Sequence, residues 1–305
     1  MIITTTKMVG IAALIALAAT GCAATASAPG GRIIAVGAEN QYTSVISQIG
    51  GKYVEATSVM SNPNTDPHTF EASANVAGEI SEAGLVVQNG LGYDGFMDKI
   101  EAATPSSNRI VISAQAVRGL PDSTANPHLW YDPKTMPAVA AKIETALAKI
   151  QPGHRAYFAA NLARFTGSFA ALDGKIAAFA SAHPGVTVAT TEPVADYLLE
   201  AIGAKNLTPW ALQAAIMNDT DPAPQDVATQ EALFTNHSVK VFVYNTQVTD
   251  SITNTYLKLA RTNDIPVVGV YETMPTDGYT YQTWMEAELR ALDRAITTGK
   301  STVKL

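Results

Sequence analysis

The chain has 305 residues, of which 47% are hydrophobic and 15% charged, and 20 basic against 27 acidic residues give a formal net charge of −7. This length and apolar content exclude a disordered chain and a small disulfide-stapled domain, and they allow two domains of ordinary size. No cluster of Lys and Arg stands out, which argues against nucleic acid as a partner.

The N-terminal segment has the pattern of an export signal. Lys7 precedes an apolar run over residues 9–19, which is too short to span a bilayer, and small residues follow it. Cys22, the only cysteine, completes an Ala-Thr-Gly-Cys sequence that resembles a bacterial lipobox. We therefore predict a signal peptide over 1–21, lipidation of Cys22 and a flexible tether over 22–31. The alternative is an ordinary secretory signal with an incidental cysteine.

Strand and helix signals then alternate through the first third of the chain. Short apolar runs predict strands, and apolar residues at helical spacing predict the helices between them. The predicted strands are 33–36, 54–60, 85–87 and 110–112, and the predicted helices are 42–49, 76–83 and 95–103. An alternation of this length predicts a parallel sheet with crossover helices.

Two helices are predicted in the middle of the chain, over 137–150 and 154–182, with a Pro-Gly pair between them. Apolar residues of the second helix recur at spacings that place them on one face. They are Phe158, Leu162, Phe165, Phe169, Leu172, Ile176 and Phe179. At ~1.5 Å per residue this helix is roughly 40 Å long, enough to cross a whole domain.

The alternation starts again after the long helix. The predicted strands are 186–190, 239–244 and 266–271, and the predicted helices are 194–202, 227–234, 253–262 and 281–298. Because this order repeats that of the first part, we predict an α/β fold of two similar lobes with parallel sheets. The first lobe covers 32–134, linking helices cover 135–183 with one long helix, and the second lobe covers 184–305. Ligands of such folds bind at the carboxyl ends of strands and in clefts between domains, so we expect the site in the inter-lobe cleft.

Two of the five histidines share a sequence context. His68 and His128 each follow a proline in a predicted loop after a strand, and each has an aromatic residue two positions later. Proline stiffens the loop and the aromatic ring can pack against the imidazole, so that the ring is held in place, as a metal site requires. One such histidine alone would be interpreted as a surface residue, but the pair predicts metal ligands. The remaining histidines, His154, His183 and His237, are interpreted as surface or helix-end residues.

Two glutamates lie at strand ends in the second lobe. Glu192 follows the strand 186–190, and Glu272 follows the strand 266–271. Glu192 could instead be an acid in the first turn of a helix, which the helix dipole favours, and Glu272 could be a solvated loop residue. Their equivalent positions at the edge that faces the cleft favour the interpretation as ligands.

With these residues, the sequence from about 32 to 300 resembles the cluster A-I solute receptors, the manganese- and zinc-binding lipoproteins of bacterial ABC importers. The resemblance is carried by Pro-His-Thr-Phe-Glu at 67–71, Asn-Gly-Leu-Gly-Tyr-Asp at 89–94 and Pro-His-Leu-Trp-Tyr-Asp-Pro at 127–133. Glu192 fits the third ligand of the family, with Gly203 as the glycine that ends the following segment. Glu272 fits the fourth, although Tyr-Glu-Thr-Met departs from the usual aspartate segment and makes Asp277 a rival ligand.

The resemblance implies one divalent transition-metal ion, bound as transported ligand by His68, His128, Glu192 and Glu272. Two carboxylates make the site rich in oxygen, which favours Mn²⁺ slightly over Zn²⁺, although Zn²⁺ binds such ligands as tightly or more tightly. The absence of a His- and Asp-rich insertion after His68 points the same way. The resemblance also implies a monomer, lipid-anchored at the outer face of the cell membrane, that delivers the ion to a membrane permease.

Two other function classes are alternatives. A metal-dependent hydrolase also uses His and Glu ligands, but it needs an open coordination position and a general base. The sequence contains no His-Glu-x-x-His, Gly-x-Ser-x-Gly or phosphate-loop motif, so we expect a protein that is not an enzyme. The other alternative is a surface adhesin on the same scaffold, which no sequence feature supports.

Overall fold

The structure is a computed structural model that describes residues 31–64, 70, 73–275 and 278–305. Its first sheet has four parallel strands in the order β2-β1-β3-β4. The strands are β1 (Ile33–Glu39), β2 (Val54–Met60), β3 (Leu85–Gln88) and β4 (Ile110–Ser113). The helices of this lobe are α1 (Asn40–Gly50), α2 (Ala74–Glu82), α3 (Gly95–Ala103) and α4 (Ala114–Arg118). The predicted alternation is confirmed, and the short helix α4 was not predicted.

The second sheet repeats this topology, with parallel strands in the order β6-β5-β7-β8. The strands are β5 (Thr187–Thr190), β6 (Lys205–Asn206), β7 (Val241–Asn245) and β8 (Val267–Val270). The helices are α7 (Asp196–Ala201), α8 (Trp210–Met217), α9 (Pro224–Thr235), α10 (Ser251–Thr262) and α11 (Tyr281–Thr298). The sequence did not predict β6 or α8, because β6 is two polar residues long and α8 is a mixed Ala-rich segment without one apolar stripe.

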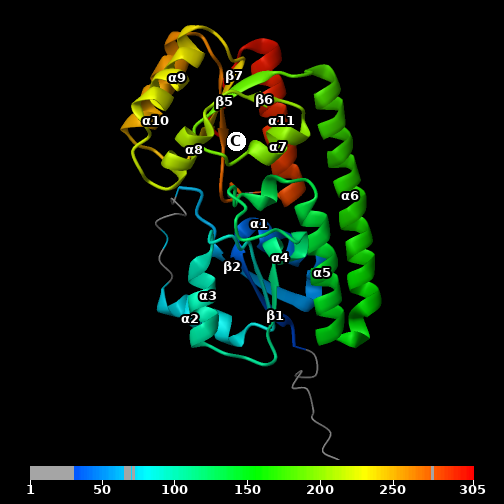
Figure 1. The fold of residues 1–305 in the computed structure, drawn as a ribbon. Helices are drawn as coiled ribbons and strands as arrows, with labels where there is room; N and C mark the ends of the chain where they lie inside the picture. The colour runs from blue at the N-terminus through cyan, green and yellow to red at the C-terminus, as the bar shows by residue number, and fades with distance from the viewer. Residues whose placement is uncertain (1–30, 65–69, 71–72, 276–277) are drawn as a thin grey trace, which may run out of the picture.

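Two helices connect the sheets, α5 (Thr135–Ile150) and the 28-residue α6 (Arg155–Ala182). Helix α6 runs along the side of both lobes (Figure 1) and packs against the other linking helix, α5, against α1 of the first lobe and against α11 of the second. Six of its seven predicted stripe residues are buried, namely Phe158, Phe165, Phe169, Leu172, Ile176 and Phe179. The prediction of two lobes joined by one long helix is confirmed. Among the described residues, no helix combines the length and apolar character needed to cross a bilayer.

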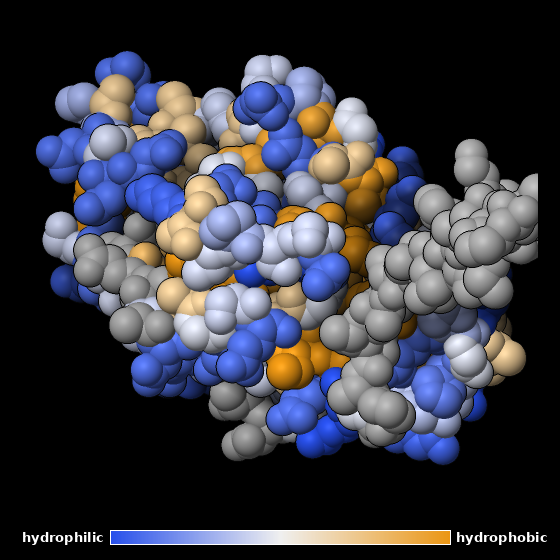
Figure 2. Space-filling model, turned by 90° about the horizontal axis from the view of Figure 1, so that it is seen from below, coloured by the Kyte–Doolittle hydropathy of each residue, from blue (hydrophilic) through white to orange (hydrophobic). Residues whose placement is uncertain are grey.

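Alternating side chains of the strands fill the core on both faces of each sheet. In β1, Ala35 packs toward the core around α5 and α6, whereas Val36 packs toward the cluster under α2 and α3. In β7, Val243 packs into the core on the α6 side of the sheet, whereas Phe242 packs into the cluster on the α10 side. This two-residue period gives central parallel strands covered by helices on both faces. Seen from below, hydrophilic side chains cover much of the surface, and apolar ones show mainly in recesses between them (Figure 2).

The carboxyl ends of the two sheets face each other. Asn40 follows β1, and its amide donates to the carbonyl oxygen of Met274 at 2.7 Å. Gln41 donates to the carbonyl oxygen of Glu272 at 3.0 Å. Both acceptors lie just after β8, so the segments that leave the strands of the two lobes are in direct contact where the sequence predicted a site.

Candidate metal centre

His128 lies at the junction of the two lobes and is fully buried. Its Nδ1 is 2.8 Å from Oδ1 of Asn126, and its Nε2 is 3.3 Å from Oε2 of Glu272. The ring meets the Trp130 and Tyr93 rings edge-on, with centroids 5.3 and 5.8 Å away. The aromatic contact predicted for this imidazole is therefore present, and it fixes the ring plane.

Asn126 determines which nitrogen of His128 faces the cleft. Its Oδ1 accepts from the backbone N–H of His128 at 3.0 Å, and its Nδ2 donates to the carbonyl oxygen of Pro193 at 2.9 Å. This pattern makes the oxygen face the histidine, so Nδ1 carries a proton and donates it. Nε2 is then the nitrogen available to a ligand. The bond to Pro193 also ties the His128 loop to the segment that follows Glu192 in the second lobe.

Glu272 is held by groups from both lobes and is also fully buried. Its Oε1 accepts from Nδ2 of Asn245 at 2.7 Å, and its Oε2 accepts from the Tyr93 hydroxyl at 3.1 Å. Its backbone N–H donates to Oε1 of Gln247 at 2.6 Å. Glu272 is therefore a built part of the cleft, and not the solvated loop acid that was the alternative.

Glu192 lies in the loop between β5 and α7 and is 2% exposed. Helix α7 begins at Asp196, so Glu192 precedes it and the interpretation as a first-turn helix acid is wrong. Oε2 of Glu192 accepts from Nδ2 of Asn245 at 3.0 Å, the same nitrogen that donates to Glu272. One amide thus joins the two carboxylates that the sequence singled out.

Three sequence-predicted positions, His68, Asp277 and Cys22, lie outside the described residues. Within the described part of the chain, no three or more His, Cys, Asp or Glu side chains come together closely enough to hold a metal ion. The structure brings His128 into direct contact with Glu272, and Asn245 holds Glu192 beside them. This is a set of one imidazole and two carboxylates, donors of the kind that divalent transition metals use.

The predicted Asn-Gly-x-Gly-x-Asp motif forms a tight loop that supports the site. Gly90, Leu91 and Gly92 have positive φ angles of 87°, 57° and 75°. Glycine adopts such angles readily, and it occupies two of these three positions. The Asp94 carboxylate closes the loop by accepting from the backbone N–H groups of Asn89 and Gly90. Burial raises the pKa of Asp94 to about 6, although these hydrogen bonds lower it.

The same loop reaches the histidine and the glutamate. Asn89 donates through Nδ2 to the carbonyl oxygen of Pro127 at 2.8 Å, next to His128, and accepts from the Tyr42 hydroxyl at 2.7 Å. Burial, and then the charge of Glu272, raise the pKa of Tyr93 well above its usual value, so its hydroxyl stays protonated and donates. The motif therefore positions both the His128 loop and a donor to Glu272.

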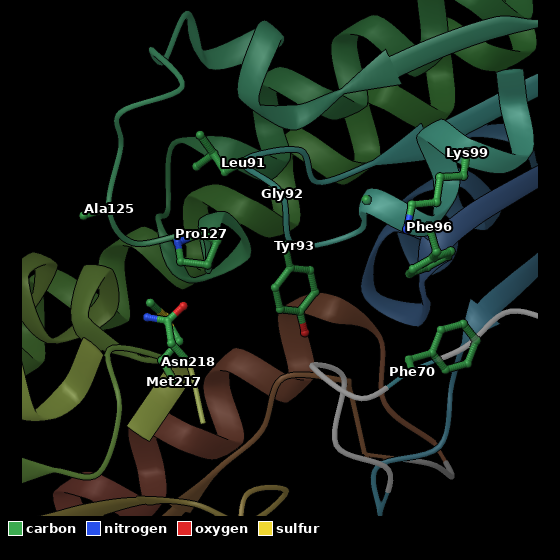
Figure 3. A pocket seen from close by; sticks show the side chains of 11 residues that line it. Phe70, Leu91, Gly92, Tyr93, Phe96, Lys99, Ala125, Pro127, Met217 and Asn218 are labelled. Atoms are coloured by element: carbon green, nitrogen blue, oxygen red, sulfur yellow. The ribbon is translucent and has the colours of Figure 1, made fainter. Parts of the chain in front are cut away.

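A pocket of about 430 Å³ lies beside the site, between the lobes. Its described lining includes Tyr93 and Pro127 from the first lobe and Met217 and Asn218 from the second. Figure 3 shows the Tyr93 ring in the middle of this lining, with its hydroxyl directed away from Leu91. Because Tyr93 lines the pocket and also donates to Glu272, the pocket adjoins the carboxylate that contacts His128.

The Tyr131 hydroxyl joins the His128 segment to the Glu272 segment and also contacts Glu288 of α11. The Tyr131 hydroxyl lies 2.9 Å from Oε1 of Glu288 and 3.0 Å from the carbonyl oxygen of Tyr271. Trp284 donates to the same Oε1 at 2.8 Å. Tyr131 follows His128 by three residues and Tyr271 precedes Glu272, so this contact holds the two lobes together. Burial raises the pKa of Glu288 to about 8, and its two hydrogen bonds lower it.

We expect Glu288→Gln to reduce the loss of stability at high pH. The pKa of Glu288 rises from 4.5 in the unfolded chain to about 8 in the fold, so the stability this group contributes is present below pH 4.5 and lost as the pH rises through 8. Between pH 6 and pH 9 the wild type should lose about 3 kcal/mol relative to the variant. Urea unfolding of both proteins at the two pH values checks this. An equal difference at both would show that Glu288 does not titrate in this range.

Several supporting residues were not predicted. Asn245, Asn126, Gln247 and Tyr93 contact the predicted ligands, and Asn245 touches both carboxylates. The signals that could have identified them are positional. Asn245 directly follows the predicted strand 239–244, and Asn126 directly precedes the Pro-His motif.

The family model described as "Zinc-uptake complex component A periplasmic" matches residues 36–295. Among curated relatives, the manganese-binding lipoprotein MntA of Bacillus subtilis is 26% identical over 140 residues, 44% of this chain and 45% of its own length. A Thermotoga maritima protein named as metal-binding is 30% identical over 94 residues, 31% of this chain and 33% of its own length. The chain therefore spans less than half the length of these relatives.

Solved structures share the fold over most of the chain. The periplasmic zinc-binding protein TroA of Treponema pallidum has a TM-score of 0.73 at 16% identity, covering 88% of this chain and 100% of that one. FpvC of Pseudomonas aeruginosa, solved with Mn²⁺, has a TM-score of 0.69 at 21% identity, with coverages of 87% and 98%. The laminin-binding protein Lbp of Streptococcus pyogenes has a TM-score of 0.72 at 19% identity, with coverages of 88% and 100%. At these identities the likeness shows the two-lobed fold.

Proposed function

Because the chain belongs to the family of zinc-uptake complex component A, matched over residues 36–295, we propose that it is an extracytoplasmic receptor that captures one divalent transition-metal ion and delivers it to the permease of an ABC importer. The observation that carries the proposal is the convergence of His128 of the first lobe with Glu272 and Glu192 of the second. Nε2 of His128 and Oε2 of Glu272 lie 3.3 Å apart, and a shared amide holds Glu192 beside them.

The proposed ligands are His68, His128, Glu192 and Glu272, with Asp277 as the rival of Glu272. Metal ligation needs a deprotonated ring nitrogen and ionised carboxylates, and the Asn126 contact presents Nε2 of His128 for this role. The ion would join the two lobes, which the hydrogen bond from Asn126 to Pro193 already connects nearby. We propose binding without catalysis, since the ion is cargo and not a resident cofactor.

Mn²⁺ and Zn²⁺ are the proposed ions, with Mn²⁺ slightly favoured by the two carboxylates. The relatives' names point both ways, because the Bacillus subtilis relative is named for manganese and the family for zinc. Metal analysis of protein purified from metal-limited medium, followed by titration with each ion, tests the proposal. It should find about one ion per chain. A protein that takes up neither ion would refute the proposed function.

We further propose the organisation predicted from the sequence: a signal peptide over 1–21, a tether over 22–31, lobes over 32–134 and 184–305, and linking helices over 135–183. The protein would be a monomer at the outer face of the cell membrane, anchored through a lipid on Cys22. The similarity to the Bacillus subtilis manganese-binding lipoprotein supports the anchor.

We expect Cys22→Ala to release the protein from membranes, because it removes the thiol that would carry the lipid. Fractionation of cells, with the protein detected in the membrane pellet or the supernatant, measures this. Ser27→Ala in the proposed tether is the matched control and should stay in the pellet. Retention of Cys22→Ala in the pellet would show that the anchor is not a lipid on this residue.

A further inference from the structure

Asn245, the last residue of β7, lies between the two proposed carboxylate ligands and is 1% exposed. Its Nδ2 donates to Oε1 of Glu272 at 2.7 Å and to Oε2 of Glu192 at 3.0 Å. A side-chain amide nitrogen has two hydrogens, so each can serve one carboxylate. Asn245 is therefore positioned to act on both ligands at once.

The orientation of the Asn245 amide is set by its other contacts. Its Oδ1 accepts from the backbone N–H of Gln247 at 3.0 Å. Its backbone N–H donates to the Thr191 hydroxyl at 3.0 Å, next to Glu192 in the chain. With the oxygen committed to a donor, the NH₂ group must face the two carboxylates. The contacts at the end of β7 therefore fix the orientation of the Asn245 amide.

The amide distinguishes the two oxygens of each carboxylate. In Glu272, Oε1 accepts the 2.7 Å bond from Asn245, whereas Oε2 accepts a longer bond of 3.1 Å from the Tyr93 hydroxyl and lies 3.3 Å from Nε2 of His128. In Glu192, Oε2 accepts the 3.0 Å bond from the same amide. Hydrogen bonds to ionised carboxylates are short and strong, so a carboxylate that turned both oxygens toward the ion would give up its bond to Asn245. Each glutamate is thereby oriented to offer the ion one oxygen.

We propose that Asn245 is a specificity-determining residue that restrains Glu192 and Glu272 to one-oxygen coordination and so limits the number of ligands around the ion. This inference rests on the proposed function. Zn²⁺ binds in sites of about four ligands, whereas Mn²⁺ is found in oxygen-rich sites of about six. Asn245 therefore shifts the selectivity of an otherwise oxygen-rich site toward Zn²⁺, and its loss lets the carboxylates supply the additional oxygens that Mn²⁺ uses.

The test is competition titration of Mn²⁺ and Zn²⁺ against a chelating indicator, with full-length wild type, Asn245→Ala and Asn245→Ser. The ratio of the Mn²⁺ Kd to the Zn²⁺ Kd should fall by about tenfold in Asn245→Ala, corresponding to about 1.4 kcal/mol. Asn245→Ser keeps one hydroxyl donor, which can hold one of the two carboxylates, so its ratio should be intermediate. It also provides a readout should the alanine variant not fold.

Gln213→Ala is the matched control. Gln213 is a buried amide of the same lobe whose Nε2 also donates to two oxygens, Thr190 Oγ1 at 2.8 Å and Asp196 Oδ2 at 2.9 Å, but neither belongs to a proposed ligand. Its loss should lower stability and leave the Kd ratio unchanged.

X-ray absorption at the zinc edge gives a second readout. The wild type should show about four light-atom neighbours around Zn²⁺, and Asn245→Ala should show more. Equal weakening of both ions in Asn245→Ala, with an unchanged ratio and neighbour number, would reduce Asn245 to a structural role and overturn the inference. Failure of the wild type to bind either ion would instead refute the proposed function.

Discussion

Replacing His128 with alanine is expected to weaken metal binding by more than about 100-fold. Loss of a residue that merely supports a ligand typically costs about 10–100-fold, so loss of the ligand itself should cost more. The imidazole is fully buried, held by Asn126 through Nδ1 and directed at Glu272 through Nε2. Titration of the purified variant with Zn²⁺ and Mn²⁺ measures the effect.

His237→Ala is the control for the loss of a histidine. His237 is exposed in the loop after α9, and its removal should leave the affinity unchanged. His68→Ala should match His128→Ala, because the sequence motif places it in the same proposed ligand set. If His128→Ala bound metal with wild-type affinity, His128 would not be a ligand, and the proposed site between the lobes would be wrong.

Replacing Glu272 with glutamine is expected to reduce affinity by a similar factor of more than about 100, since it exchanges an anionic oxygen ligand for a neutral amide of the same shape. The fold should be preserved or slightly stabilised without metal, because Glu272 and Glu192 share one amide donor and the change removes one of two neighbouring negative charges. Isothermal titration together with thermal unfolding of the metal-free protein separates the two effects.

Asp277→Asn distinguishes the rival assignment of the fourth ligand. If Glu272 is the ligand, Asp277→Asn binds metal like the wild type and Glu272→Gln does not. The reverse pattern would transfer the role to Asp277. Glu272 is favoured because His128, Tyr93 and Asn245 all converge on its carboxylate.

Much of the fold could be predicted because its signals are local. Strands such as 54–60 and helices such as 95–103 and 281–298 were placed at their observed bounds, since each carries a clear period of two or 3.6 residues. The seven apolar residues on one face of α6 were predicted from their spacing alone. Strand β6 could not be found in this way, because its two polar residues are defined by pairing with β5 and not by a pattern of their own.

The candidate site was predicted less completely, for a physical reason. His128, Glu192 and Glu272 stand at strand ends or in a distinctive motif, and local sequence marks those places. The role of Asn245 depends on two residues that lie 53 and 27 positions away along the chain. That of Asn126 depends on Pro193 in the other lobe. Such contacts exist only once the lobes are packed together, so no periodicity in the sequence reveals them.

The central claim is that one metal ion is held between the lobes by these residues. Anomalous diffraction at the zinc edge, from crystals of the Zn²⁺-loaded protein, tests it most directly. The predicted result is a single strong peak at ~2.0–2.2 Å from Nε2 of His128 and from one oxygen each of Glu192 and Glu272. A peak coordinated by none of these three residues, or no peak in protein exposed to saturating Zn²⁺, would contradict it.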